Sequence, residues 1–172
     1  ARLKYAVSRE AFHDEGPAHN VILDAYYLDQ YEVSNKQYSD FMKATDHPAP
    51  AYWDDRRRNK PAQPVSGINW NDASSFCSWA NKRLPTEAEW EFACKAGTET
   101  AYSFGDDAEE LSNHSWHLGN SRFKYQKVGQ KSPNPFGLYD MHGNVWEWVN
   151  DWYEPYYKMR SKNNPLGPEN GE

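Results

Sequence analysis

The chain has 172 residues, a length that corresponds to one domain or at most two small ones. Its formal net charge is −6 and its pI is about 5.5, which argues against a nucleic-acid binder, because such a protein needs a basic face to neutralise phosphates. Aliphatic residues are scarce, but 16% of the chain is aromatic, and each buried ring removes about 150–250 Å² from water. We therefore expect a folded, loop-rich domain with an aromatic core. No apolar run approaches the roughly 20 residues that span a bilayer.

The first element expected is a strand, or a bent pair of strands, over residues 19–33. Apolar side chains recur there at alternate positions with polar residues between them, which is typical of a half-buried strand. Ser34 and Gln37 then form the S-x-x-Q pattern of a capping box, so a helix is predicted to run to about Lys43. Residues 44–66 contain several prolines and follow neither a helix nor a strand period, which indicates a loop.

Two consecutive helices are predicted next, over roughly residues 71–81 and 87–96. Asn69 or Asn71 can cap the first helix, and Thr86 opens a capping box for the second. We expect the two helices to pack on each other through their apolar faces. The side chains expected at this contact are Phe76, Trp79, Trp90 and Ala93.

The remaining sequence predicts loops and one further strand. Residues 98–136 are rich in Gly, Ser, Asn and Asp, and loops of that length in a compact domain are usually functional or tied down. Residues 143–150 alternate as a strand with Trp146 and Trp148 on one face. The tail over 155–172 has no period and is expected to be extended or frayed. The predicted fold class is α+β with little regular structure, and a doubly wound sheet is excluded because no alternating βαβ rhythm exists.

The segment from Asp140 to Glu147 is the strongest candidate for a binding site. Calcium binds six to eight oxygens from carboxylates, amides and carbonyls, and these two acidic residues bracket a tight turn. Gly143 permits a positive φ in that turn, so that carbonyl groups can point inward. Glu147 also stands between two tryptophans, where an unpaired carboxylate is costly to bury. From this chemistry alone, the equal alternative is a capped turn in which Glu147 bonds to the backbone.

Cys77 and Cys94 are predicted on the inward faces of the two consecutive helices. Two cysteines permit one internal disulfide, two thiols, or two bridges to something outside this chain. Neither has a neighbour that would clearly activate a thiolate, so structural roles are favoured over a catalytic one.

Five blocks of the sequence resemble, in order, segments of the formylglycine-generating enzyme family, also called the sulfatase-modifying factor family. The most specific are R-L-P-T-E-A-E-W-E, which begins at Arg83, and G-N-V-W-E-W, which begins at Gly143. The five blocks occupy residues 29–35, 64–73, 82–93, 136–140 and 143–148.

The resemblance implies a single sulfatase-modifying-factor-like domain over residues 1–172, incomplete at both ends relative to the family. It implies the formylglycine-generating-enzyme fold, an α+β fold related to C-type lectins. It also implies bound Ca²⁺, held by the side chains of Asp140 and Glu147 and by the carbonyl oxygens of Gly143 and Val145. This favours the metal over the capped turn.

The catalytic residues of the family lie in a segment that this sequence does not contain. The resemblance implies a later Gly-Gly-Ser segment with two reactive cysteines, which bind Cu⁺ and, with O₂, oxidise a substrate cysteine to formylglycine. Cys77 and Cys94 instead match positions that are disulfide-bonded to that segment in secreted relatives, so we expect no bond between them. A periplasmic or secreted location is favoured if they are bridged, and buried thiols are expected in a reducing compartment.

Three functions stay open at this point. The first is the N-terminal part of a copper- and O₂-dependent oxidoreductase, which would be inactive alone. Its partner would be a sulfatase or a second chain that carries the C-terminal segment. The second is a non-catalytic relative that uses the lectin-like scaffold to bind a peptide, glycan or protein. The third is a structural subunit of an assembly, for which residues 152–157 would form an aromatic contact patch. A cysteine pair after a Gly-Gly-Ser motif in the continuing gene would favour the enzyme.

Overall fold

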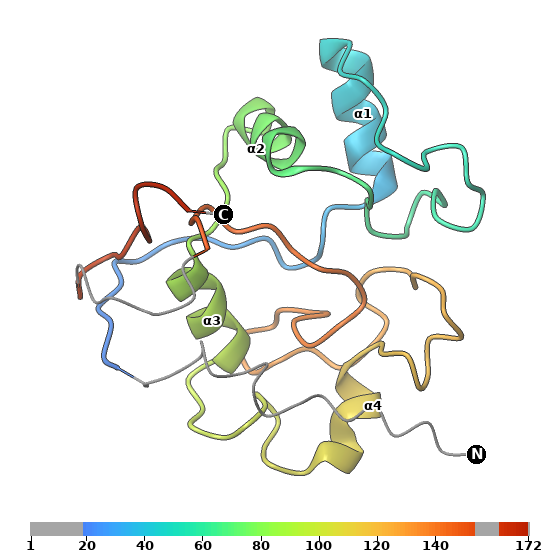
Figure 1. Cartoon of the computed structure of the whole chain (residues 1–172). Coiled ribbons are helices and arrows are strands. Elements are labelled where there is room, and N and C mark those ends of the chain that lie inside the picture. Colours follow the sequence, from blue (N-terminus) through green and yellow to red (C-terminus); the bar gives the residue numbers. More distant parts are fainter. Residues whose placement is uncertain (1–18, 154–161, 172) are drawn as a thin grey trace.

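The computed structural model describes residues 19–153 and 162–171, in which the regular structure is helical. In chain order the elements are α1 (Asn35–Thr45), α2 (Trp70–Trp79), α3 (Glu87–Lys95), the 3₁₀ turn η2 (Ala108–Glu110) and α4 (Leu111–His114). Helices α1 and α2 lie together at one end, α3 and α4 lie toward the other, and long non-helical segments cross between them (Figure 1). Well under half of the described residues are in regular structure, as the sequence predicts.

Helix α1 begins where the capping pattern predicts. The Ser34 side chain accepts a hydrogen bond from Gln37 N at 3.4 Å, and Gln37 Oε1 accepts one from Ser34 N at 2.9 Å. This reciprocal pair confirms the capping box. The helix extends slightly beyond the predicted Lys43, to Thr45, and ends because Asp46 adopts a left-handed conformation with φ 54°.

The next two helices are also confirmed, within a residue or two of their predicted bounds. Asn69, rather than Asn71, caps α2, since its side chain accepts from Asp72 N at 3.0 Å and Asp72 accepts from Asn69 N at 2.9 Å. In α3, the Thr86 side chain accepts from Glu89 N at 3.2 Å, and Glu89 accepts from Thr86 N at 2.8 Å. All three main helices therefore start with a complete capping box.

The hydrophobic core is a cluster of aromatic rings between α1 and α2. Tyr38 stacks on Phe76 with 5.8 Å between ring centroids, and Phe41 meets Phe76 edge-on at 5.6 Å. Val65, from the loop that joins the two helices, completes the buried cluster. Offset and edge-to-face rings of this kind stabilise a core beyond their area burial. The aromatic core that the composition predicts is confirmed.

The expected packing of the two consecutive helices on each other is wrong. Among the described residues, α2 contacts α1 and makes no contact with α3. Trp79 packs against Phe41 at a centroid distance of 5.6 Å, whereas Trp90 of α3 donates a hydrogen bond to Glu147. Ala93 is buried elsewhere, beneath a later loop. The reason is that the aromatic side chains of α1 already cover the inner face of α2.

The two expected strands do not form within the described residues. Residues 19–33 and 143–150 run without a ladder of hydrogen bonds, because each meets neighbouring chain only at isolated points. The bridges present are Ile22 with Asn163, Ser34 with Pro64, and Tyr102 with Gly105. In the described residues, the helices of the expected α+β class are present and its sheet is not.

The long loop over residues 98–136 contains η2 and α4 and is tied down, as its length predicts. Asn134 provides the main attachment to α3. Its Nδ2 donates to Ala93 O at 2.7 Å, and its Oδ1 accepts from Phe136 N at 3.0 Å and from Leu138 N at 3.1 Å. This buried amide fixes the chain just before the candidate site.

Part of the predicted tail lies outside the described residues. Residues 154–161 and 172 belong to that part, and they include most of the predicted aromatic contact patch. Trp152 and Tyr153, which begin the patch, are both exposed. In the described part of the chain, no helix has the length and apolar character needed to cross a membrane.

Candidate functional site

The loop from Asp140 to Glu147 is held by backbone hydrogen bonds. Gly143 N donates to Asp140 O at 3.0 Å, and Asn144 N donates to Trp116 O at 2.8 Å. Asp140 and Asn144 take the positive φ values of 61° and 68°, which Asp and Asn tolerate better than most residues. Gly143 does not take the expected positive φ. It is needed for space, because a Cβ there would collide with the Trp116 carbonyl.

Each of the four predicted calcium ligands keeps an oxygen that no donor contacts among the described residues. Asp140 is only 2% exposed, its Oδ2 accepts from Gly129 N at 2.7 Å, and its Oδ1 is buried without a partner. Glu147 accepts one indole N–H through Oε2, which leaves Oε1. The carbonyl oxygens of Gly143 and Val145 accept no bond from a described residue. Only the Asp140 oxygen is a buried orphan, which is a rare feature, whereas Gly143 and Val145 are partly exposed and Glu147 is exposed. Two carboxylates with two carbonyls are ligands that Ca²⁺ prefers.

The electrostatics of the loop also fit a cation. Burial raises the pKa of Asp140, and burial followed by the charge of Asp140 raises the pKa of Glu147. The expected burial of Glu147 between two tryptophans is not found, because Glu147 and both neighbouring tryptophans are exposed. Glu147 faces an adjoining cavity, and the surrounding protein still limits its solvation. A bound cation would stabilise the ionised form of both groups.

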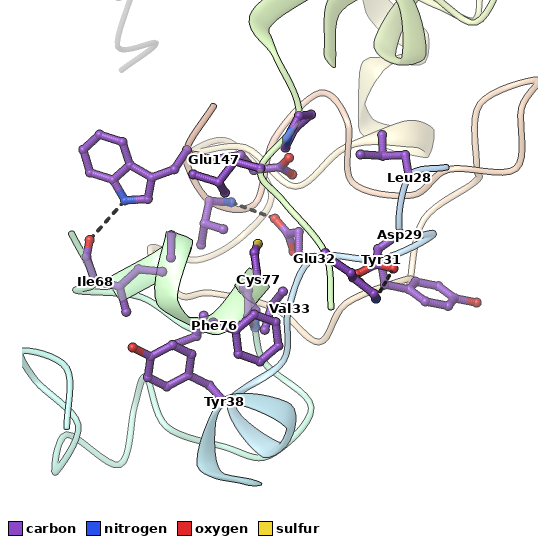
Figure 2. Close-up of a pocket in the computed structure, with 18 of the residues that line it drawn as sticks. Leu28, Asp29, Tyr31, Glu32, Val33, Tyr38, Ile68, Phe76, Cys77 and Glu147 are labelled. Carbon is purple, nitrogen blue, oxygen red and sulfur yellow. Dashed lines mark hydrogen bonds and ion pairs between the residues drawn. The ribbon is translucent and has the colours of Figure 1, made fainter. Parts of the chain in front are cut away.

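A third carboxylate, Glu32, reaches the same loop from the segment that precedes α1. Its Oε2 accepts from Asn144 Nδ2 at 2.7 Å. Its Oε1 accepts from Val145 N at 3.2 Å, the dashed line at Glu32 in Figure 2. Burial, and then the charges of the two loop carboxylates, raise the pKa of Glu32 to about 9. Sequence reasoning does not single out this residue. The available signal is a carboxylate set between an aromatic and an aliphatic residue in an alternating segment.

Side-chain ligands alone do not form a metal site. Within residues 19–153 and 162–171, no group of three or more His, Cys, Asp and Glu side chains is arranged to hold a metal ion. The predicted calcium set does not require such a group, because two of its four ligands are backbone carbonyls.

A cavity of about 1100 Å³ adjoins the loop. Figure 2 shows Glu32, Cys77 and Glu147 on the walls of this one space. Tyr27 and Trp146 also line it, and both are fully exposed. Large exposed aromatic rings around a cavity indicate an interaction surface for another polypeptide segment or a ligand. Other lining residues are Tyr26, Leu28, Val33, Phe76 and Trp148.

The two cysteines are free and are not bonded to each other. Cys94 Sγ lies 3.4 Å from Met141 O and 3.7 Å from His142 Nδ1. Burial, and then the charge of Glu147, raise the pKa of the Cys94 thiol to about 11. Burial also raises the pKa of Cys77. Neither thiol therefore has the electropositive setting that would activate a thiolate.

These observations define a loop-rich, aromatic-cored domain with an oxygen-lined loop beside a large cavity. Residues 4–170 match the family profile described as the sulfatase-modifying factor enzyme 1-like domain, and the chain belongs to this family.

Named relatives and a solved structure agree with this assignment. The chain is 29% identical to the formylglycine-generating enzyme of Bos taurus over 92% of its own length, and it spans 57% of that protein. It is 31% identical to the formylglycine-generating enzyme of Thermomonospora curvata over 91% of its length and spans 71% of that enzyme. The structure of PvdO from Pseudomonas aeruginosa superposes with a TM-score of 0.78 at 27% identity, covering 92% of this chain and 70% of PvdO.

Proposed function

We propose that the protein containing this chain oxidises a substrate cysteine to formylglycine. In this proposal, the described residues form a calcium-stabilised scaffold and the catalytic thiols lie outside them. The observation that carries the proposal is the match to two formylglycine-generating enzymes over more than nine-tenths of this chain. The chain spans only part of those enzymes, so the segment that carries the catalytic thiols is itself part of the proposal.

Calcium has a structural role in this proposal. Asp140 and Glu147 would hold it by their side chains, and Gly143 and Val145 by their carbonyl oxygens. The ion would neutralise the buried Asp140 and the neighbouring Glu147 and fix the loop. The support for it is the unpaired oxygen on each of the four ligands.

The described residues do not fit Cu⁺. That ion prefers soft thiolate ligands, whereas burial raises the pKa of both thiols here. The two thiols are also half-buried and are carried by helices that do not pack together. The copper-binding pair would therefore come from a separate segment, supplied by the rest of the polypeptide or by a second chain.

The cavity is the place proposed for that segment. Residues 19–33 and 143–150, which both alternate like strands, contribute to its walls. An extended segment between them would cover the exposed rings of Tyr27 and Trp146 and give both segments a strand partner. The α+β, C-type-lectin-like architecture expected from the sequence would then be complete.

The overall reaction requires an oxidant and a reductant. The C–S bond of the substrate cysteine breaks and a C=O bond forms, so that sulfur leaves as sulfide. Molecular oxygen takes two electrons from the substrate carbon and two from two molecules of an added thiol, which become a disulfide. In the overall balance, the products include one aldehyde oxygen and one water. An assay of this reaction must therefore contain both O₂ and a thiol reductant.

The test uses the full-length natural protein with Cu⁺, O₂, a thiol reductant and a sulfatase that carries an unmodified cysteine. We expect an aldehyde on the sulfatase, detected by a hydroxylamine probe and located by mass spectrometry. A control lacking O₂ should give none. If the folded, calcium-loaded protein forms no aldehyde, while it still binds the sulfatase or another protein, the catalytic proposal is wrong. The non-catalytic binding or assembly role would replace it.

A further inference from the structure

Glu32 links two segments that are far apart in the sequence. Its carboxylate accepts hydrogen bonds from the side chain of Asn144 at 2.7 Å and from the backbone N–H of Val145 at 3.2 Å. In Figure 2 the bond to Val145 spans the gap between the segment before α1 and the loop that ends in Glu147. Each carboxylate oxygen therefore has one donor from the loop.

The orientation of Asn144 is fixed independently of Glu32. Its Oδ1 accepts a hydrogen bond from Gln126 N at 3.0 Å, so its amide nitrogen must face the Glu32 carboxylate. The backbone of Asn144 is also held at φ 68°, which an L-residue seldom adopts without surrounding support. Glu32 thus contacts the loop at one of its two residues with a positive φ.

The peptide group between Asn144 and Val145 lies between the two carbonyls proposed to bind calcium. Because Glu32 fixes the N–H of that peptide, it sets the orientation of the Gly143 carbonyl on one side and of the Val145 carbonyl on the other. Mutation of outer partners of this kind typically weakens metal binding by about 10–100-fold.

We infer that Glu32 is a positioning residue for the calcium site, which it serves by holding the loop rather than by binding the ion. This inference rests on the proposed site formed by Asp140, Gly143, Val145 and Glu147. Glu32 is assigned the outer role because both its oxygens already accept hydrogen bonds.

The variant Glu32→Gln tests this role with little change in shape. Its single carbonyl oxygen can serve only one of the two donors, and its amino group would face the other. The matched control is Asp29→Asn, which makes the same carboxyl-to-amide replacement in the same segment but disrupts an ion pair with Lys82 (2.6 Å) instead. Both variants are made in the full-length natural protein.

The measurement is the dissociation constant of Ca²⁺, by calorimetric titration of chelator-stripped protein. We expect Glu32→Gln to weaken binding by about 10–100-fold and Asp29→Asn to leave it unchanged. If Glu32 supports only the fold, Glu32→Gln will lower the melting temperature of the metal-free protein without changing calcium affinity. That result would overturn the inference while leaving the calcium site intact. Failure of the unaltered protein to bind calcium would instead overturn the site itself, together with this role.

A second variant covers the case in which Glu32→Gln does not fold. Asn144→Gly removes the other half of the contact and accepts the positive φ without strain. It should weaken calcium binding in the same direction. The double variant should lose less than the sum of the two single losses, because both remove one shared interaction. Fully additive losses would contradict the proposed link between Glu32 and Asn144.

Discussion

The indole Nε1 of Trp90 donates a hydrogen bond to Oε2 of Glu147 over 2.7 Å. Trp90 belongs to α3, and Glu147 ends the candidate calcium loop, so this bond joins the helix to the site. It uses one oxygen of the carboxylate and leaves the other for a cation. A charge-assisted bond of this length also restricts the side chain to one orientation, which is a requirement for a preformed ligand.

The aromatic core predicts a large effect of truncating Phe76. This ring contacts both Tyr38 and Phe41, so Phe76→Ala removes contacts between α1 and α2 and leaves a cavity. We expect the free energy of unfolding to fall by about 3–5 kcal/mol, measured by urea denaturation. The control is Phe123→Ala, since Phe123 is 77% exposed and should change stability little. Equal effects of the two variants would contradict the assigned core.

The ion pair between Arg83 and Glu89 predicts a specific acid sensitivity. Two hydrogen bonds of 2.7 Å join them, and this pairing is the main cause that lowers the pKa of Glu89. A lowered carboxyl pKa adds stability that is present above the ordinary value near 4.5 and is lost as the pH falls through the folded-state pKa.

Glu89→Gln should therefore flatten the loss of stability below about pH 4.5. At neutral pH, Glu89→Gln should lower the free energy of unfolding by less than about 1 kcal/mol, because the Arg83 side chain is 61% exposed and solvent screens the pair. The readout is the midpoint of denaturation as a function of pH. The control is Glu91→Gln, on the exposed side of the same helix. If Glu91→Gln changed the denaturation midpoint below about pH 4.5 as much as Glu89→Gln does, the role assigned to the ion pair between Arg83 and Glu89 would be contradicted.

Helix starts were predictable from the sequence because their determinants are local. Ser34, Asn69 and Thr86 each bond to a residue three positions later, so a short window of sequence contains both partners. The strand pattern was equally visible. The strands themselves did not form, because a strand requires a neighbour that no local pattern supplies.

The candidate site was predictable only in part. The acidic and glycine residues of the loop at 140–147 were identified because they follow one another closely in the chain. Glu32 was missed because its contact with Val145 joins residues 113 positions apart. The packing of α2 on α1 was missed for a related reason, since it depends on the path of the intervening chain.

The thiols are predicted to react slowly. Burial raises the pKa of both Cys77 and Cys94, so few thiolates are present at neutral pH. Native protein should be alkylated by iodoacetamide much more slowly than protein unfolded in urea, as measured by mass spectrometry of timed samples. Rapid alkylation of the native protein, or an intrachain bond between these cysteines, would contradict their assignment as half-buried structural residues.

The metal-free protein is predicted to lose stability as the pH rises. Burial and the neighbouring carboxylates raise the pKa of Glu32 from 4.5 to about 9. Between these values the unfolded chain releases a proton that the folded chain retains, so the free energy of unfolding decreases with increasing pH. In chelator, the melting temperature should fall across this range, and Glu32→Gln should reduce the slope. Calcium should restore stability at the alkaline end. A pH-independent melting temperature would contradict this reading of the carboxylate cluster.

Calorimetric titration of Ca²⁺ into the chelator-stripped full-length protein, compared with Glu147→Ala, tests the central claim most directly. The account predicts one saturable calcium site in the unaltered protein, with a calcium-dependent rise in melting temperature, and the loss of both in Glu147→Ala. The control is Glu91→Ala, an acidic residue on the exposed side of α3, which should bind calcium normally. The proposed calcium site would be contradicted if Glu147→Ala changed neither the calcium binding nor the melting temperature, measured with and without chelator.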